Sequence, residues 1–227
     1  MTGINAFDLS IETAFDAVWV AADQLVRINP ATDEARVILR IPLPVGGISG
    51  STLAVDRRHL WIGTSDGLLL RVDSSGEVTG RRSVTDSIQE VATGEGGVWV
   101  ADQLAGVIAR IDPGTLVTRT EIPFSGSVDA MKVFAGNLWA LDFRTGVLRR
   151  ISILQDREVG QQVDVPSGAT ALAVGLDAIW LSYEDGAVVK VDPATGRAST
   201  FATVVGSARA IVVDVVRGSV WVDVRRS

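Results

Sequence analysis

The chain has 227 residues, of which 47% are hydrophobic and 21% charged, a balance that supplies ample apolar material for a globular core. Its formal net charge of −6 argues against a nucleic-acid partner, because phosphate binding needs clustered Lys and Arg. The chain contains no cysteine, which excludes disulfides, thiolate chemistry and zinc sites built on Cys.

Targeting signals are also missing from the sequence. The N-terminal region lacks a basic stretch followed by an apolar run, so we predict no signal peptide. No apolar run approaches the roughly 18 residues that a transmembrane helix needs, so we predict no membrane insertion. The lack of cysteine favours a cytoplasmic location, although a longer parent protein could carry either signal.

Tryptophan recurs along the chain at intervals of 42, 38, 40, 41 and 41 residues. Each tryptophan lies in a short apolar run, and in the first five repeats a basic residue, an apolar β-branched residue and a turn former follow, as in Arg110-Ile111-Asp112. A repeat of about forty residues is typical of β-propeller blades, which pack radially against one another. We therefore expect all six indoles to fill the core: Trp19, Trp61, Trp99, Trp139, Trp180 and Trp221.

The fifth repeat shows four predicted strands. They are short, rich in Val and Ala, and bounded by turn residues. A turn at Asp192–Gly196 joins the third strand to the fourth, and its Pro and closing Gly suit a type I turn with a bulge. The four strands are predicted at Ala171–Val174, Ala178–Ser182, Ala187–Val191 and Ala198–Val204.

The repeats together predict a single all-β domain over residues 1–227, a propeller of about six four-stranded blades. The last blade is incomplete, because only two strands surround Trp221 before the sequence ends at Ser227. An open ring would expose strand edges. We expect residues Ile4–Ser10 to close it by pairing with Ser219–Val224, or the chain to be part of something larger.

The pattern Leu/Val-Trp-Val followed by Gly-x-Val-x-Arg-Ile-Asp-Pro-x-Thr-Gly resembles the YVTN and NHL-like propellers, especially the virginiamycin B lyase-like group. The resemblance covers about Ile11 to Trp221, and Gly97–Val100 with Gly106–Pro113 is a clear instance. It implies a repeat protein of bacterial type. The lyase that gives the group its name uses a metal with paired histidines and a glutamate. Only His59 is present here, in a predicted exposed turn, so that site is not carried over.

Two sets of loops gather at one end of a propeller's central channel: those entering each inner strand and those joining the second and third strands. Small polar residues recur in the first set, and Glu90, Asp129 and Arg209 depart from that pattern. Because repetition explains packing, such departures are candidates for ligand binding.

The second set of loops is acidic. Asp102 and Asp142 each stand three residues after a tryptophan in adjacent repeats, and we expect them to lie close together. Paired carboxylates recruit a cation, and oxygen ligands suit Ca²⁺ or Mg²⁺. Tyr183 and Glu184 add recognition groups in the same set. The alternative is a solvated acidic rim that serves solubility.

The sequence therefore favours a non-catalytic binding or scaffolding module without a cofactor. It would recognise a peptide, a protein or a small polar ligand at the acidic mouth of the channel. The alternative is a metal-assisted lyase or hydrolase that uses Glu90, Asp102, Asp129 and Asp142 as ligands of Ca²⁺ or Mg²⁺. A third possibility is a structural or sensory unit of a larger chain.

Overall fold

The computed structural model describes residues 10–41 and 51–225. This part of the chain consists of strands and turns, and it contains no helix that could cross a membrane. The chain divides into two compact units, Met1–Ser125 and Gly126–Ser227.

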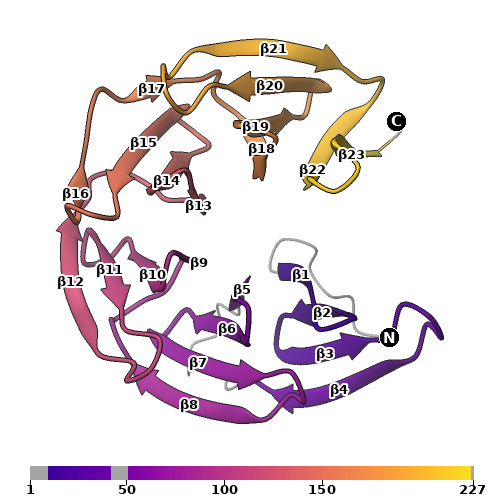
Figure 1. The fold of residues 1–227 in the computed structure, drawn as a ribbon, viewed down its shortest axis with the longest axis vertical. Helices are drawn as coiled ribbons and strands as arrows, with labels where there is room; N and C mark the ends of the chain where they lie inside the picture. Colours follow the sequence, from indigo (N-terminus) through magenta and orange to yellow (C-terminus); the bar gives the residue numbers. More distant parts are fainter. Residues whose placement is uncertain (1–9, 42–50, 226–227) are drawn as a thin grey trace. The chain divides into compact units, whose positions relative to one another are not determined.

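The first unit holds three antiparallel four-stranded sheets, which we call blades one to three. In each sheet the strands pair in chain order, and the first strand lies on the inner side of the unit while the fourth lies on the outer side (Figure 1). Blade one comprises β1 (Ser10–Ala14), β2 (Ala17–Ala21), β3 (Gln24–Ile28) and β4 (Ala35–Arg40). Blade two comprises β5 (Ser51–Val55), β6 (His59–Thr64), β7 (Leu68–Asp73) and β8 (Val78–Ser83). Blade three comprises β9 (Glu90–Gly94), β10 (Gly97–Asp102), β11 (Val107–Ile111) and β12 (Thr118–Pro123).

The second unit holds blades four and five and a two-stranded hairpin. Blade four comprises β13 (Ala130–Phe134), β14 (Asn137–Asp142), β15 (Val147–Ser152) and an outer edge split into β16 (Arg157–Glu158) and β17 (Val163–Asp164). Blade five comprises β18 (Ala169–Gly175), β19 (Ala178–Tyr183), β20 (Ala187–Val191) and β21 (Ala198–Thr203). The hairpin pairs β22 (Ser207–Asp214) with β23 (Ser219–Arg225).

The architecture is an all-β propeller, and the strands predicted for the fifth repeat are confirmed within a few residues. Within residues 10–41 and 51–225, five four-stranded blades are present, and the sixth repeat contributes the β22–β23 hairpin. The predicted closing strand lies outside the described residues except for Ser10, which begins β1 and pairs with Ala21.

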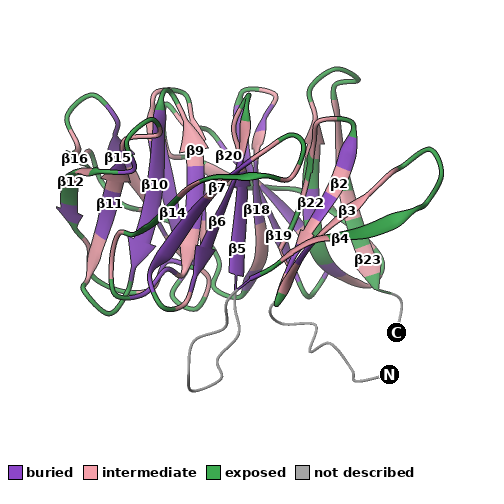
Figure 2. Ribbon diagram, turned by 90° about the horizontal axis from the view of Figure 1, so that it is seen from below, coloured by how far each residue is buried: buried purple, intermediate pink, exposed green. Residues whose placement is uncertain are grey.

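Burial follows strand position within each blade. The second strands are almost wholly buried and the outermost strands are largely exposed, as Figure 2 shows for β10 and β12. Apolar side chains of neighbouring sheets form the cores. Trp19 and Leu25 of blade one pack with Leu60 and Ile62 of blade two, and Ile179 and Leu181 of blade five pack with Trp139 of blade four. Each blade is therefore stabilised mainly by the sheet beside it.

The tryptophans are buried in the five blades but not in the hairpin. Their exposed fractions are 3% or less from Trp19 to Trp180, whereas Trp221 is 61% exposed. The prediction that all six fill the core is wrong for Trp221. In the described part of the chain β23 pairs only with β22, so no third strand covers this indole.

The Asp-Pro turns between third and fourth strands have a structural role. Asp112 Oδ1 accepts hydrogen bonds from the N–H groups of Gly114 (2.9 Å) and Thr115 (2.8 Å), and Asp192 Oδ1 accepts the equivalent pair in blade five. An aspartate that bonds its own backbone two residues ahead stabilises the turn. These carboxylates hold the chain rather than a ligand.

Candidate functional site

Asp102 ends β10 and is buried, with 1% of its surface exposed. Its Oδ2 accepts hydrogen bonds from Thr85 Oγ1, from Asp86 N–H (3.1 Å) and from Ser87 N–H (3.3 Å), and its Oδ1 accepts one from Ala105 N–H (2.9 Å). Burial alone would raise the pKa of Asp102, but these hydrogen bonds outweigh it and lower the pKa below its ordinary value. The carboxylate joins the loop that enters β9 to the loop that leaves β10.

Asp142 occupies the same place in blade four and is also buried. Its Oδ1 accepts from the N–H groups of Arg144 (2.9 Å) and Thr145 (3.0 Å), and its Oδ2 accepts from Ser127 N–H (3.4 Å). Burial opposes ionisation here too, yet the hydrogen bonds lower the pKa of Asp142. Both aspartates therefore bind the loops of their own blade. They belong to different units, so the predicted pairing across a channel mouth remains a prediction.

Polar residues at the starts of the inner strands of blades three and four also hold loops or neighbouring strands. Gln89 Oε1 accepts from Gln103 N–H in blade three, and Asp129 Oδ2 accepts from Phe143 N–H (2.8 Å) in blade four. Glu90 Oε2 accepts a hydrogen bond from Thr52 Oγ1 (3.1 Å) of blade two. No group of three or more His, Cys, Asp or Glu side chains suited to a metal ion occurs in residues 10–41 and 51–225.

Tyr183 is buried at the end of β19, where its hydroxyl donates a hydrogen bond to Pro166 O (3.0 Å). Burial, with a smaller contribution from the charge of Asp185, raises the pKa of Tyr183 to about 12. Glu184 and Arg209 differ from it, because their side chains are 71% and 47% exposed and face each other at 3.9 Å. These two side chains are therefore open to a ligand, whereas Tyr183 is not.

Val205 was not predicted, and it stands four residues before Arg209 in the chain. It is 93% exposed in the loop that enters β22. That loop lies directly on the β19–β20 loop: Val204 N–H donates to Gly186 O (2.9 Å), and a Cβ at Gly186 would stand 2.2 Å from Val204 O. We call Glu184, Val205 and Arg209 the loop surface. The sequence feature that could have indicated this surface is Val205 itself, because the loops that enter the inner strands otherwise carry small polar residues.

Each blade also carries a pair that the sequence showed only as a motif. The tryptophan of the second strand lies opposite a basic residue of the third, as in Trp61 with Arg71. In four blades the cation stands over the indole, at 5.1 Å in blade three and 5.4 Å in blade five. Arg71 also reaches the next blade, donating from Nη1 to Pro113 O (2.6 Å) and Gly114 O (3.1 Å). The repeated Arg therefore has a structural role.

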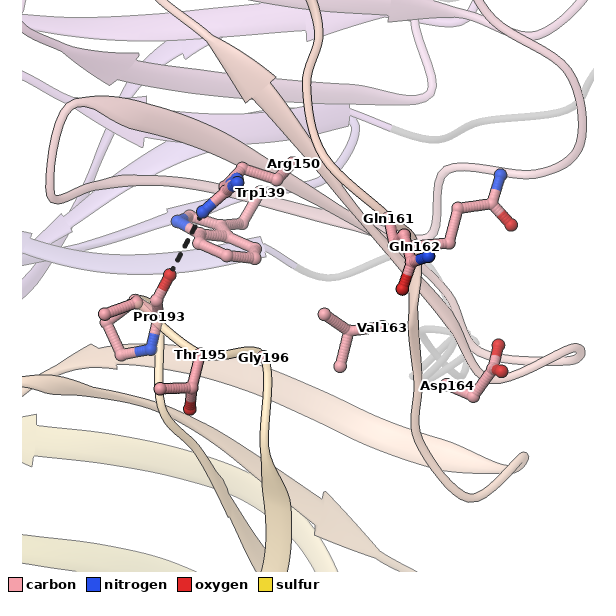
Figure 3. Close-up of a pocket in the computed structure, with 10 residues that line it drawn as sticks. Trp139, Arg150, Gln161, Gln162, Val163, Asp164, Pro193, Thr195 and Gly196 are labelled. Atoms are coloured by element: carbon pink, nitrogen blue, oxygen red, sulfur yellow. Dashed lines mark hydrogen bonds between the residues drawn. The ribbon is translucent and has the colours of Figure 1, made fainter.

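One cavity of about 370 Å³ lies beside the corresponding pair in blade four (Figure 3). Trp139 and Arg150 form one side, and the turn of blade five at Pro193–Gly196 forms another. The segment around the split outer strand completes it with Gln161, Gln162, Val163 and Asp164. We call this cavity the blade-four pocket.

A second cavity, of about 1120 Å³, lies in the first unit and is lined by the turns at Asp56–His59, Thr93–Gly97 and Pro113–Gly114. It contains His59, which begins β6 with its side chain 26% exposed and its Nδ1 3.5 Å from Asp56 Oδ1. The histidine is therefore half-buried, because its ring packs edge-on against Trp61 at 5.9 Å. The sequence predicted an exposed one.

Comparison with known proteins identifies the fold alone. No family model matches the chain, and no curated protein matches it. Among solved structures, the chain is similar to one from the crystal structure of the mitotic checkpoint complex, with a TM-score of 0.72 and 12% identity over 92% of this chain and 68% of that one. An identity this low supports the β-propeller fold. The resemblance to the virginiamycin B lyase-like group receives no support from these comparisons.

Proposed function

We propose that this chain is a non-catalytic propeller that binds a protein or peptide through its loop surface. The observation that carries the proposal is the exposed apolar side chain of Val205, on a loop hydrogen-bonded to the β19–β20 loop, together with the exposed pair of Glu184 and Arg209. Interfaces combine apolar contact area with charged groups that set orientation. The fold does not need this combination, because an ion pair at 3.9 Å between exposed groups adds little stability.

The other predicted ligand groups support a module without catalysis. The carboxylates of Asp102, Asp142 and Asp129 accept hydrogen bonds from backbone N–H groups of their own blades, and Tyr183 donates to a backbone carbonyl. Groups engaged in this way hold loops in place, which makes a rigid platform for recognition.

We also propose that the propeller has six blades and that the β22–β23 hairpin is part of the sixth.

Photo-crosslinking at single sites tests it. A photoreactive residue replaces Val205 in one variant and Leu154 in another, because both positions are 93% exposed and lie in the same unit. We expect a discrete adduct with a protein or peptide partner from position 205 only. An excess of the unlabelled parent chain should compete for that partner, whereas an excess of the Arg209→Glu chain should not. Equal adducts from both positions, or full competition by Arg209→Glu, would count against the loop surface.

A further inference from the structure

Blade four differs from the other blades at its outer edge. In blades one, two, three and five the fourth strand runs for six residues, whereas in blade four β16 and β17 have two residues each. Val159 N–H still donates to Arg150 O of β15 (2.9 Å), and residues 160–162 between Val159 and β17 leave the edge of that strand. The blade-four pocket lies where this segment departs, so the break in the strand creates the cavity (Figure 3).

The break changes the surroundings of one guanidinium. In blade two, the continuous strand supplies Thr79, whose Oγ1 and carbonyl accept from Arg71 Nε (3.0 Å) and Nη2 (2.9 Å). In blade four, Arg150 Nε reaches Val159 O at 3.4 Å and Nη1 reaches Pro193 O at 3.5 Å, both at the limit of a hydrogen bond. No hydrogen bond from Nη2 to a described residue is found. Arg150 therefore keeps donor capacity that Arg71 has used.

The position of Arg150 is nevertheless fixed. Its guanidinium stands 6.0 Å from the centre of the Trp139 ring, and Trp139 is 1% exposed. Gly160 passes close to its outer side, where a Cβ would stand 2.6 Å from Nη2. Residue 160 must be glycine for the segment to pass without displacing the cation. A cation held by packing loses little conformational freedom when it binds a ligand.

The remaining lining is polar and can complete a ligand's hydrogen bonds. Gln161 and Gln162 each offer an amide, which donates and accepts. The Thr195 hydroxyl of the facing turn is engaged in that turn, where it accepts a hydrogen bond from Arg197 N–H (3.3 Å). Asp164 lies across the pocket from Arg150 and does not occupy its donors (Figure 3). The pocket thus presents one cation with planar donors, and the groups across from it are two amides and the Asp164 carboxylate.

We propose that the blade-four pocket binds a carboxylate through the Nη atoms of Arg150. A guanidinium matches the two oxygens of a carboxylate with parallel hydrogen bonds, and this geometry makes the pair specific as well as strong. A volume of about 370 Å³ holds a carboxylate on a short chain. The carboxylate can belong to a free small acid or to an acidic side chain of a peptide, since both present the same group. This site is separate from the loop surface and does not depend on it.

The test uses the full chain with succinate and, separately, a short peptide that contains one glutamate. Binding is followed through the side-chain N–H signals of Arg150 and Trp139 in ¹⁵N spectra and by calorimetry. We expect Arg150→Lys to weaken binding by about tenfold or more, because lysine keeps the charge but lacks the planar pair of donors. The substitution should fold, because blade five carries Lys190 at the same place over Trp180.

Arg71→Lys is the matched control, since Arg71 has the same place in blade two with its donors satisfied. It should leave binding unchanged. Gln161→Leu provides a second variant, which removes one amide of the lining at an exposed position and should weaken binding without changing the melting temperature. Binding of succinate alone would indicate a small acid, and tighter binding of the peptide would indicate an acidic side chain. No response to either probe, or equal loss in Arg71→Lys and Arg150→Lys, would overturn the proposal.

Discussion

Blade five and the β22–β23 hairpin carry the same tryptophan in the second strand, yet the two indoles have opposite surroundings. Trp180 is 3% exposed, lies under Lys190 of the third strand and packs with Ile211 of the hairpin. Trp221 pairs with Val212 across β22, and both side chains are 61% exposed. The comparison teaches that the tryptophan of a second strand is buried by the third strand of its own sheet and by the sheet that follows. The hairpin of the first two strands alone does not bury it.

Removing each indole should give the largest difference between the two regions. Trp180→Ala leaves a cavity between blade five and the hairpin, and we expect it to lower the free energy of unfolding by about 3–5 kcal/mol. Trp221→Ala removes a side chain that is mostly in water, and we expect a loss below about 1 kcal/mol. Urea denaturation of both variants measures the difference. Equal losses would mean that Trp221 is buried in solution.

The same contrast applies to carboxylates. Asp102 is buried and accepts four hydrogen bonds, whereas Asp223 of the hairpin is exposed. Asp102→Ala leaves buried donors without an acceptor, which should cost about 2–3 kcal/mol of stability. Asp223→Ala should change the free energy of unfolding by less than about 0.5 kcal/mol. A neutral Asp102→Ala in denaturant titrations would contradict the structural role given to this residue.

The lowered pKa of Asp102 predicts a dependence on pH with a definite sign. A carboxyl whose pKa is lower in the folded state stabilises the fold above its unfolded value of 3.8, and this contribution is lost as pH falls through the folded value. The free energy of unfolding should therefore decrease as the pH is lowered beyond about 4. Asp102→Asn should show a shallower fall in thermal melts between about pH 4 and pH 2.

Fluorescence quenching separates the two regions without unfolding them. Acrylamide reaches exposed indoles first, and among the tryptophans only Trp221 exceeds 3% exposure. We expect one readily quenched component in the parent chain and its disappearance in Trp221→Phe. The quenching of Trp180→Phe should match that of the parent in this component. A Trp221→Phe chain that keeps the component would show that another indole is accessible.

The smallest effect is expected at the loop surface. Arg209→Ala removes an ion pair of 3.9 Å between exposed side chains, so the free energy of unfolding should change by less than about 0.5 kcal/mol. Denaturant titration at low and high salt measures it. A large loss of stability would assign Arg209 to the fold and weaken its proposed part in binding.

Local signals made much of the fold predictable. Apolar runs bounded by turn formers located β18–β21, and the Asp-Pro turns bond within a few residues of the chain. The role of Asp102 was not predictable, because its donors at Thr85–Ser87 are 15 to 17 residues away and meet it only through strand pairing. The exposure of Trp221 depends on a strand count, which the indole's own neighbours in sequence do not reveal.

The site was predicted in part for the same reason. Departure from the repeat marked both Arg209 and Asp129 as candidates for ligand binding; both are exposed, and Asp129 also caps its own loop. The blade-four pocket follows from a strand break that only Gly160 and two glutamines suggest in the sequence. Arg150 looked like every other repeat position, because its difference from Arg71 lies in the acceptors around it.

The bond from Arg71 to the turn at Pro113–Gly114 has a consequence for how such chains grow. The arginine lies in one blade and its acceptor in the next, and Arg150 reaches toward Pro193 in the same sense. A duplication that copies a whole repeat reproduces donor and acceptor together, so every new junction inherits its bond. Recombination that exchanges third strands alone would separate them. Inheritance by whole repeats therefore preserves the contacts between blades while leaving the outer edges free to diverge.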